Sequence, residues 1–214
     1  MVSKEARLAS RNLRLSALWV LQPDYRVIIS SLQSRGYTTE GLERGPSSVQ
    51  IGKKGTVTVE ANLERRALAV ESQTSIRDLV EAYSELTEIN EEIGTDMKKS
   101  VFFHEFVGDF DMYTRKSPLE TLNRLPVKSD IVAGISQELG KPIAPFTIRF
   151  GLKDVEPSSQ DWLDIRIEPM LMSAKTRYFL GVVYRSSFDE VIPFVKSIEG
   201  KLKGIIEILE KETR

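Results

Sequence analysis

The 214-residue chain contains no cysteine and only one histidine, His104. Without cysteine, disulfide frameworks, thiolate nucleophiles, Fe–S clusters and cysteine-ligated zinc sites are all excluded. A single histidine also excludes any metal site with two or more histidine ligands, and a Ser-His-Asp triad would have to use His104. The glycine-rich motifs of nucleotide-binding proteins and the G-x-S-x-G motif of α/β-hydrolases are missing, so no motif identifies a cofactor.

Long apolar runs and an excess of one charge are missing too. The longest apolar run spans residues 17–21, far below the roughly 18 that a membrane helix needs, and no small-residue cleavage site follows it. We therefore expect a cytoplasmic protein with no membrane segment. The formal net charge is -1, so composition gives no indication of an anionic partner. Asn and Gln are scarce beside 29% charged residues, a balance typical of thermophile proteins.

The first half of the chain predicts a strand, a short helix, three strands and a long helix. Strict alternation predicts the first strand at 12–21, and helical spacing predicts a helix at 24–36 that ends at Gly36. The next expected elements are a hairpin over 49–60 that turns at Gly55, a strand over 67–71 and a helix over 76–93.

The same order recurs in the second half. A strand over 101–112 precedes a helix that starts at Ser117-Pro118 and a short helix over 129–139. Three strands are then expected over 146–153, 162–168 and 176–185. A last helix begins at Ser187, with Pro193 expected in its first turn. Its expected buried stripe includes Ile198, Leu202, Ile205 and Leu209.

We therefore expect one α+β domain over residues 1–214, internally duplicated as β-α-β-β-β-α halves over about 12–93 and 101–211. The halves would form one curved, mainly antiparallel sheet with two long helices packed on one face. This order of segments resembles the duplicated saddle of TATA-box-binding proteins, and also the helix-grip folds that hold small ligands in a curved sheet. The resemblance concerns order alone, and the near-neutral charge differs from the strongly basic DNA saddle.

The first candidate site lies within the expected strand over 101–112. Alternation places Glu105, Asp109 and Asp111 on one face of this strand and His104 on the other, among phenylalanines. Carboxylates in this arrangement can bind a hard cation or act as acid and base once another strand approaches. A metal-assisted enzyme that uses these four residues is therefore one hypothesis. The simpler interpretations are a salt-bridged face and a hydrogen-bonded core histidine.

A second candidate site follows the strand over 162–168. Trp162, Asp164, Arg166 and Glu168 share one side of this strand. One arginine between two carboxylates is typical of a cross-strand ion-pair ladder. With Trp162 beside it, the same row is also a candidate lining for a polar ligand groove.

The N-terminus carries a third pattern. Lys4, Arg7, Arg11 and Arg14 recur at helical spacing, and residues 1–16 sum to +3. Such an arm is either a solvated helix face or a contact for phosphate or an acidic partner. Nucleic-acid binding through this arm is the least favoured reading, because no basic patch elsewhere extends it.

The strand over 176–185 indicates where a partner would bind. Tyr178, Leu180 and Val182 alternate with Phe179 and Val183, so both faces of this strand are apolar. The long helices can cover only one face. We therefore expect a ligand cavity or a homodimer on the other face. The resulting hypothesis is a binding protein, and not a covalent catalyst, that contacts a small ligand or a protein partner with the sheet face away from the long helices.

Overall fold

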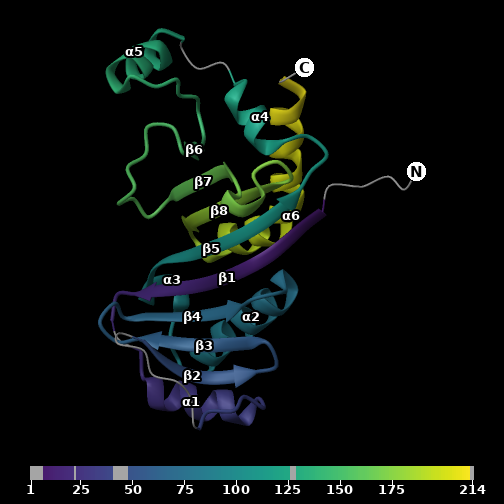
Figure 1. The fold of residues 1–214 in the computed structure, drawn as a ribbon. Helices are drawn as coiled ribbons and strands as arrows, with labels where there is room; N and C mark the ends of the chain where they lie inside the picture. Colours follow the sequence, from purple (N-terminus) through teal and green to yellow (C-terminus); the bar gives the residue numbers. More distant parts are fainter. Residues whose placement is uncertain (1–6, 22, 41–47, 126–128, 213–214) are drawn as a thin grey trace, which may run out of the picture.

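A computed structural model describes residues 7–21, 23–40, 48–125 and 129–212 (Figure 1). Eight strands form one antiparallel sheet in the order β2-β3-β4-β1-β5-β8-β7-β6. The expected α+β class and antiparallel sheet are confirmed. Within these ranges, no helix combines the length and the apolar character needed to cross a membrane.

The first half of the sheet surrounds the long strand β1. Its elements are β1 (Arg7–Trp19), α1 (Tyr25–Ser34), β2 (Val49–Lys54), β3 (Val57–Asn62), β4 (Ala67–Ser72) and α2 (Ile76–Glu92). Polar side chains start both helices, since Asp24 accepts a hydrogen bond from the Arg26 amide and Ser75 accepts one from the Asp78 amide. Gly55 has a φ of 60° in the β2–β3 turn, which is why a glycine is needed there.

The second half surrounds β5, which pairs with β1 at the centre of the sheet. Its elements are α3 (Met97–Ser100), β5 (Val101–Tyr113), α4 (Pro118–Asn123), α5 (Ser129–Leu139), β6 (Ile148–Gly151), β7 (Trp162–Pro169), a 3₁₀ turn (Leu171–Ser173), β8 (Arg177–Ser186) and α6 (Phe188–Glu212). Every helix and strand expected in the two halves is present, and α3 and the 3₁₀ turn are additions. The strand order 2-3-4-1 of the first half corresponds to 6-7-8-5 in the second.

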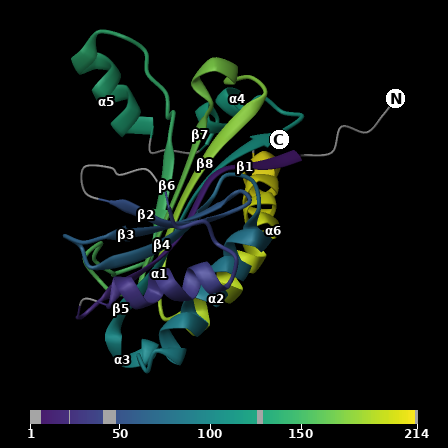
Figure 2. The ribbon, with the colours of Figure 1, turned by 90° about the horizontal axis from the view of Figure 1, so that it is seen from below.

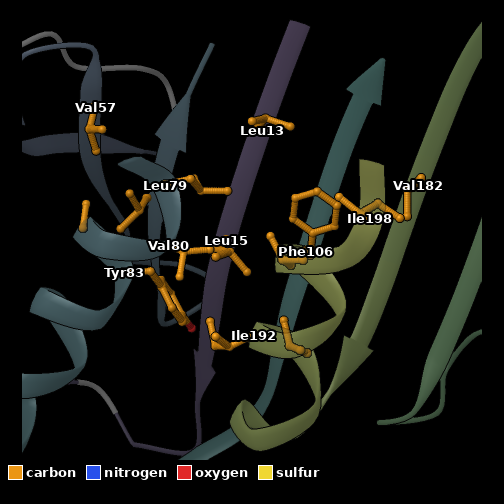
Figure 3. Packing of buried hydrophobic residues seen from close by; sticks show 14 of the residues in the cluster. Leu13, Leu15, Val57, Leu79, Val80, Tyr83, Phe106, Val182, Ile192 and Ile198 are labelled. Carbon is orange, nitrogen blue, oxygen red and sulfur yellow. The ribbon is translucent and has the colours of Figure 1, made fainter. Parts of the chain in front are cut away.

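The helices α1, α2 and α6 lie on one side of the sheet (Figure 2). Helix α2 packs on β1 and β4, α6 packs on β5 and β8, and the two helices contact each other. The apolar core fills the space between these helices and the sheet, as Figure 3 shows for Leu15, Tyr83 and Phe106. We call the opposite side of the sheet the open face.

The strand β5 keeps its alternation through Gly108. The sequence leaves room for a bulge at this glycine, but the pairing of β5 with β8 runs from His104 to Tyr113 without a shift. Gly108 instead makes room for two core rings, because a Cβ there would lie 2.5 Å from Phe106 and 2.8 Å from Phe110. His104, Phe106 and Phe110 therefore stay on the core side of the sheet.

The buried stripe of α6 differs from expectation at two positions. Ile198, Leu202 and Leu209 are buried, but Ile206 is the fully buried neighbour and Ile205 is only partly covered. The 3.6-residue period does not explain this difference, because seven residues make about two turns and place Ile205 close to the line of Ile198. Pro193 lies beyond the first turn, because the helix already begins at Phe188.

Truncation of this stripe tests the packing of α6. We expect Leu202→Ala to lower the free energy of unfolding by about 2 to 5 kcal/mol, because Leu202 is 0% exposed. The control is Ile208→Ala on the same helix, where the side chain is 61% exposed and the change should stay below about 0.5 kcal/mol. Urea unfolding measures both, and a Leu202 effect as small as the control would place the stripe at the surface.

Candidate ligand-binding site

The single histidine sits at the core side of the sheet between α2 and α6. His104 is 5% exposed, and its Nδ1 atom lies 2.6 Å from the Tyr83 hydroxyl. The Phe188 ring, in the first turn of α6, meets the imidazole edge-on at 5.4 Å between ring centres. Three elements far apart in sequence, α2, β5 and α6, therefore fix the orientation of this ring.

Burial controls the protonation of His104. Desolvation lowers its pKa to about 4, although the nearby Asp189 acts in the opposite direction. Burial also raises the pKa of the Tyr83 hydroxyl, so Tyr83 keeps its proton and shares a hydrogen bond with Nδ1. In the tautomer in which Tyr83 donates this bond, the proton of the neutral imidazole is on Nε2, for which the structure gives no hydrogen-bond partner within the described part of the chain.

A pocket of about 530 Å³ opens beside this imidazole, and we call it the His104 pocket. It lies where the end of α2, the start of β5 and the start of α6 meet the segment before β7. Its lining residues are Thr87, Glu91, Val101, Phe102, Phe103, His104, Gln160, Asp161, Ser186, Ser187, Phe188 and Asp189. Aromatic rings and hydroxyl groups thus alternate with acidic side chains around one cavity.

The lining of this pocket is acidic. Glu91, Asp161 and Asp189 contribute carboxyl groups, and no lysine or arginine is among the lining residues that the structure describes. The guanidinium of Arg185, on the neighbouring β8, points to the open face and pairs there with Glu105 at 2.6 Å. The described lining of the pocket therefore carries three acidic side chains and no basic one.

The register of β5 and β8 places Ser186 opposite His104. The Ser186 hydroxyl does not contact the imidazole but lies 2.6 Å from Asp161 Oδ1 and 2.5 Å from Glu190 Oε2. A serine nucleophile needs a base that accepts its proton and is itself oriented by a third group. The described contacts of Ser186 and His104 do not form such a relay.

The four residues of the first candidate site do not converge. His104 lies on the core side of β5, whereas Glu105, Asp109 and Asp111 lie on the open face, because neighbouring residues of a strand point to opposite sides. Asn12 lies 3.4 Å from Asp109, and Arg11 lies 2.6 Å from Asp111. The structure therefore keeps His104 apart from the three carboxylates, and no group of three His, Asp or Glu side chains fit to hold a metal occurs within the described ranges.

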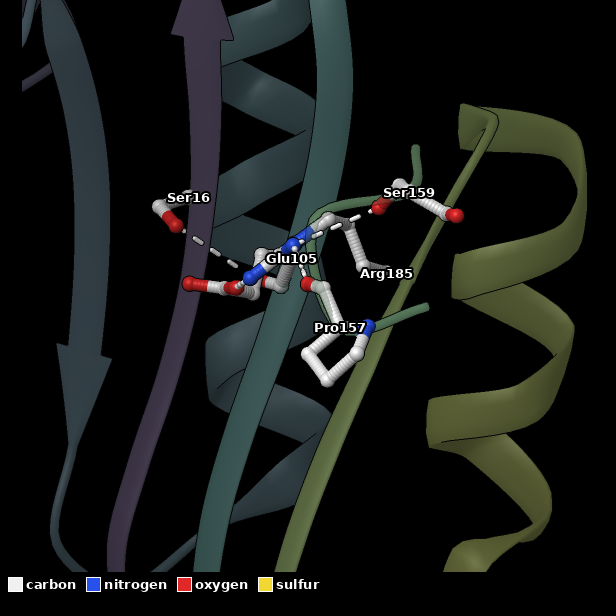
Figure 4. A network of polar contacts seen from close by, with 5 residues as sticks. All are labelled: Ser16, Glu105, Pro157, Ser159 and Arg185. Atoms are coloured by element: carbon white, nitrogen blue, oxygen red, sulfur yellow. Dashed lines mark hydrogen bonds and ion pairs between the residues drawn. The ribbon is translucent and has the colours of Figure 1, made fainter. Parts of the chain in front are cut away.

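Glu105 belongs instead to a network centred on Arg185 (Figure 4). Two guanidinium nitrogens of Arg185 donate to the Glu105 carboxylate at 2.9 and 2.6 Å. A third nitrogen donates to the carbonyl oxygens of Pro157 and Ser159. The network ties β5 and β8 to the segment before β7.

The second candidate site is part of an ion-pair ladder across β6, β7 and β8. Asp164 accepts from Arg149 of β6 at 2.7 and 2.5 Å, and Arg166 lies 3.9 Å from Glu168. Trp162 lies at the end of this row, opposite Arg185 of β8. These contacts account for the row as an ion-pair ladder.

The open face is covered by guanidinium groups of the same chain. Arg166 lies over the Phe179 ring at 5.0 Å, and Arg185 lies over Phe103 at 4.5 Å. The sequence pattern predicts an apolar face at β8 that requires a partner, but alternation alone does not reveal that arginines from neighbouring strands cover its rings. The need for a partner on this face is therefore smaller than expected.

The expected N-terminal helix is wrong, because β1 already begins at Arg7. Arg11 pairs with Asp111, and Arg14 pairs with Glu60 at 3.0 Å and with Glu71. Lys4 lies outside the described residues. The last two arginines of this pattern, Arg11 and Arg14, are therefore neutralised within the sheet.

Sequence reasoning singled out His104 but missed the residues around it. Asp161, Asp189 and Phe188 lie more than fifty residues away in the chain, and no local spacing connects them with His104. The signal that could have indicated these neighbours is the pairing of the strands over 101–112 and 176–185. Its register, once known, places Ser186 and the start of α6 beside His104.

Comparisons with known proteins add little to this geometry. No protein-family model matches the chain. No curated protein matches its sequence. Among solved structures, Methanococcus jannaschii TBP is similar over 96% of this chain and 99% of that chain, with 9% identity and a TM-score of 0.36. Similarity at this level carries no argument about function, so the site is interpreted from its own chemistry.

The pH dependence of stability tests the burial of His104. An unfolded histidine titrates near 6.5, whereas folded His104 has a pKa of about 4, so the unfolded chain binds the additional proton between these values. The contribution of the neutral imidazole to the free energy of unfolding is therefore complete above about pH 6.5 and is lost as the pH decreases toward 4. We expect the wild type to lose about 2 to 3 kcal/mol more than His104→Gln between about pH 7 and about pH 4.5. Urea unfolding at the two pH values measures this, and equal losses would contradict a buried neutral imidazole.

Proposed function

We propose that this protein is a binding protein whose His104 pocket holds a small organic cation with an apolar or aromatic body. The observation that carries the proposal is one cavity of about 530 Å³ in which carboxyl groups, aromatic rings and a neutral imidazole converge. Cavities of about 300 to 1,000 Å³ with a few polar groups among apolar walls are typical of small-molecule sites.

The charge balance favours a cation. Helix α6 begins at the pocket, and its N-terminal dipole, equivalent to about half a positive charge, by itself favours an anion. The first turn of this helix also carries two carboxylates, Asp189 and Glu190, whose charge opposes that dipole. Glu91 and Asp161 add further negative charge from two other elements.

The aromatic rings and the imidazole define the rest of the ligand. Phe102 and Phe188 offer ring surfaces that attract an ammonium group and bury an apolar body. The Nε2 proton of His104 is a hydrogen-bond donor without a partner in the described structure. A ligand that also carries an acceptor, such as an ether or carbonyl oxygen, would satisfy this donor.

The open face supports the small-ligand or protein-partner site expected there less well. Its guanidinium groups already bind carboxylates or cover rings, so a ligand would have to replace existing contacts. The metal-assisted enzyme has no supporting geometry at Glu105, Asp109 and Asp111. We therefore assign binding to the His104 pocket.

A series of three similar molecules tests the charge preference. Benzylamine, benzyl alcohol and benzoate share an aromatic ring and differ in charge. We expect benzylamine to bind most tightly, benzyl alcohol more weakly and benzoate not at all, in amide chemical-shift titrations of the wild-type protein. The shifts should map to residues 101–104 and 186–189. Equal binding of all three, or tighter binding of benzoate, would contradict a cation site.

Single charge removals test the position of the bound cation. Glu91→Gln removes a carboxylate from the pocket, and we expect it to weaken benzylamine binding by up to about fivefold, the effect of losing a partly exposed charge pair. The control is Glu88→Gln, which removes an exposed carboxylate of the same helix outside the pocket and should leave affinity unchanged. Equal effects of both changes would indicate nonspecific attraction only.

We also propose that the two halves of the chain are an internal duplication, as the sequence predicts. The matching strand orders 2-3-4-1 and 6-7-8-5 and the long helix that ends each half support it. Under this proposal, β1 and β5 are equivalent strands, and the His104 pocket lies where the second half meets α2 of the first. Superposition of the two halves by a two-fold rotation tests it, and a rotation that fails to overlay α2 on α6 would contradict it.

A further inference from the structure

The second half of the molecule exposes apolar residues in one short stretch of chain. Of the sixteen large apolar side chains that are exposed within the described residues, seven fall between residues 131 and 152. They are Ile131, Ile135, Leu139, Ile143, Phe146, Phe150 and Leu152. Monomeric proteins rarely concentrate exposed apolar surface in this way unless it is an interaction site.

Helix α5 carries the first part of this surface and covers nothing. Ile131, Ile135 and Leu139 follow one another at four-residue steps on one face of the helix, and they are 53%, 45% and 60% exposed. The helix stands away from the sheet in both Figure 1 and Figure 2. It has no extensive contact with any other element of the described structure. An eleven-residue helix is normally stable only when its apolar face packs against something.

The edge strand β6 carries the second part. Ile148 and Phe150 face the core side, because they pair with Ile167 and Ile165 of β7, but Phe150 remains 45% exposed. At the opposite edge of the sheet, α1 covers β2 and buries Ile28 and Leu32 completely. No helix provides such cover for β6 within the described residues.

The two uncovered surfaces are both apolar and carry charges of opposite sign. Helix α5 carries Asp130 and Glu138 and no basic residue, whereas the segment 140–153 has Lys141 and Lys153 at its two ends and no acidic residue. The third basic residue of this segment, Arg149, is paired with Asp164 and takes no part in this argument. An apolar helix with acidic flanks therefore matches an apolar strand with basic flanks, and both belong to the same chain. Such self-complementarity is the basis of a two-fold symmetric interface.

We infer that two copies of this chain associate by reciprocal docking, in which α5 of each copy packs on the core side of β6 in the other. This interface lies outside the open face, where the sequence pattern predicts a homodimer, and it is independent of the His104 pocket. Each copy then contributes the apolar stripe of its α5 and the core side of its β6 to one continuous interface.

Sedimentation velocity at micromolar concentrations tests the association. We expect a wild-type dimer, and we expect Ile135→Asp to raise the dimer dissociation constant by about tenfold or more, because it places a carboxylate in the centre of the helix stripe. The control is Ile208→Asp on α6, where an equally exposed apolar side chain lies outside the interface. Far-UV circular dichroism of both variants checks that the fold is retained.

Charge exchange tests the pairing of helix with strand. Glu138→Lys alone and Lys141→Glu/Lys153→Glu alone should each be monomeric, because like charges then meet in both halves of the interface. Their equimolar mixture should dimerise again, because each half then joins opposite charges. A monomeric wild type, a dimer that tolerates Ile135→Asp, or a mixture that stays monomeric would overturn the inference.

Discussion

The antiparallel pairing of β1 with β5 is the contact on which the rest of the molecule depends. These two thirteen-residue strands run side by side through the centre of the sheet and join the two halves of the chain. Each strand presents apolar residues to the helices and polar residues to the open face. All other strands extend the sheet outward from this pair, and α2 and α6 pack across it.

This pairing places two neighbouring residues of β5, His104 and Glu105, in different environments on the two faces of the sheet. His104 on the core side is desolvated and lines a cavity, whereas Glu105 on the open face is bound to Arg185. The acidic side chains that surround His104 come from other elements that converge at the start of α6. The same alternation gives the open face an arginine-rich surface in which guanidinium groups cover Phe103 and Phe179.

Much of the fold could be predicted from the sequence because its local signals are strong. Alternation in β1 and β5, the N-cap serines Ser75 and Ser117, and the glycine after α5 all agree with the observed elements. The face of each β5 residue could also be predicted, since period two fixes it. What could not be predicted was the set of neighbours across strands and helices. Asp161 and Phe188 reach His104 only through the register of β5, β7 and β8, which no local pattern encodes.

Because the protein has one histidine, its imidazole gives a single set of nitrogen signals that test the central claim directly. A long-range ¹H–¹⁵N correlation spectrum should show a neutral ring protonated at Nε2, which stays neutral down to about pH 5. Addition of benzylamine should shift the Nε2 signal, while Nδ1 keeps its hydrogen bond to the Tyr83 hydroxyl. A ring that titrates near pH 6.5, or one that does not respond to benzylamine, would contradict the account of His104 as a buried neutral group in a cation-binding pocket.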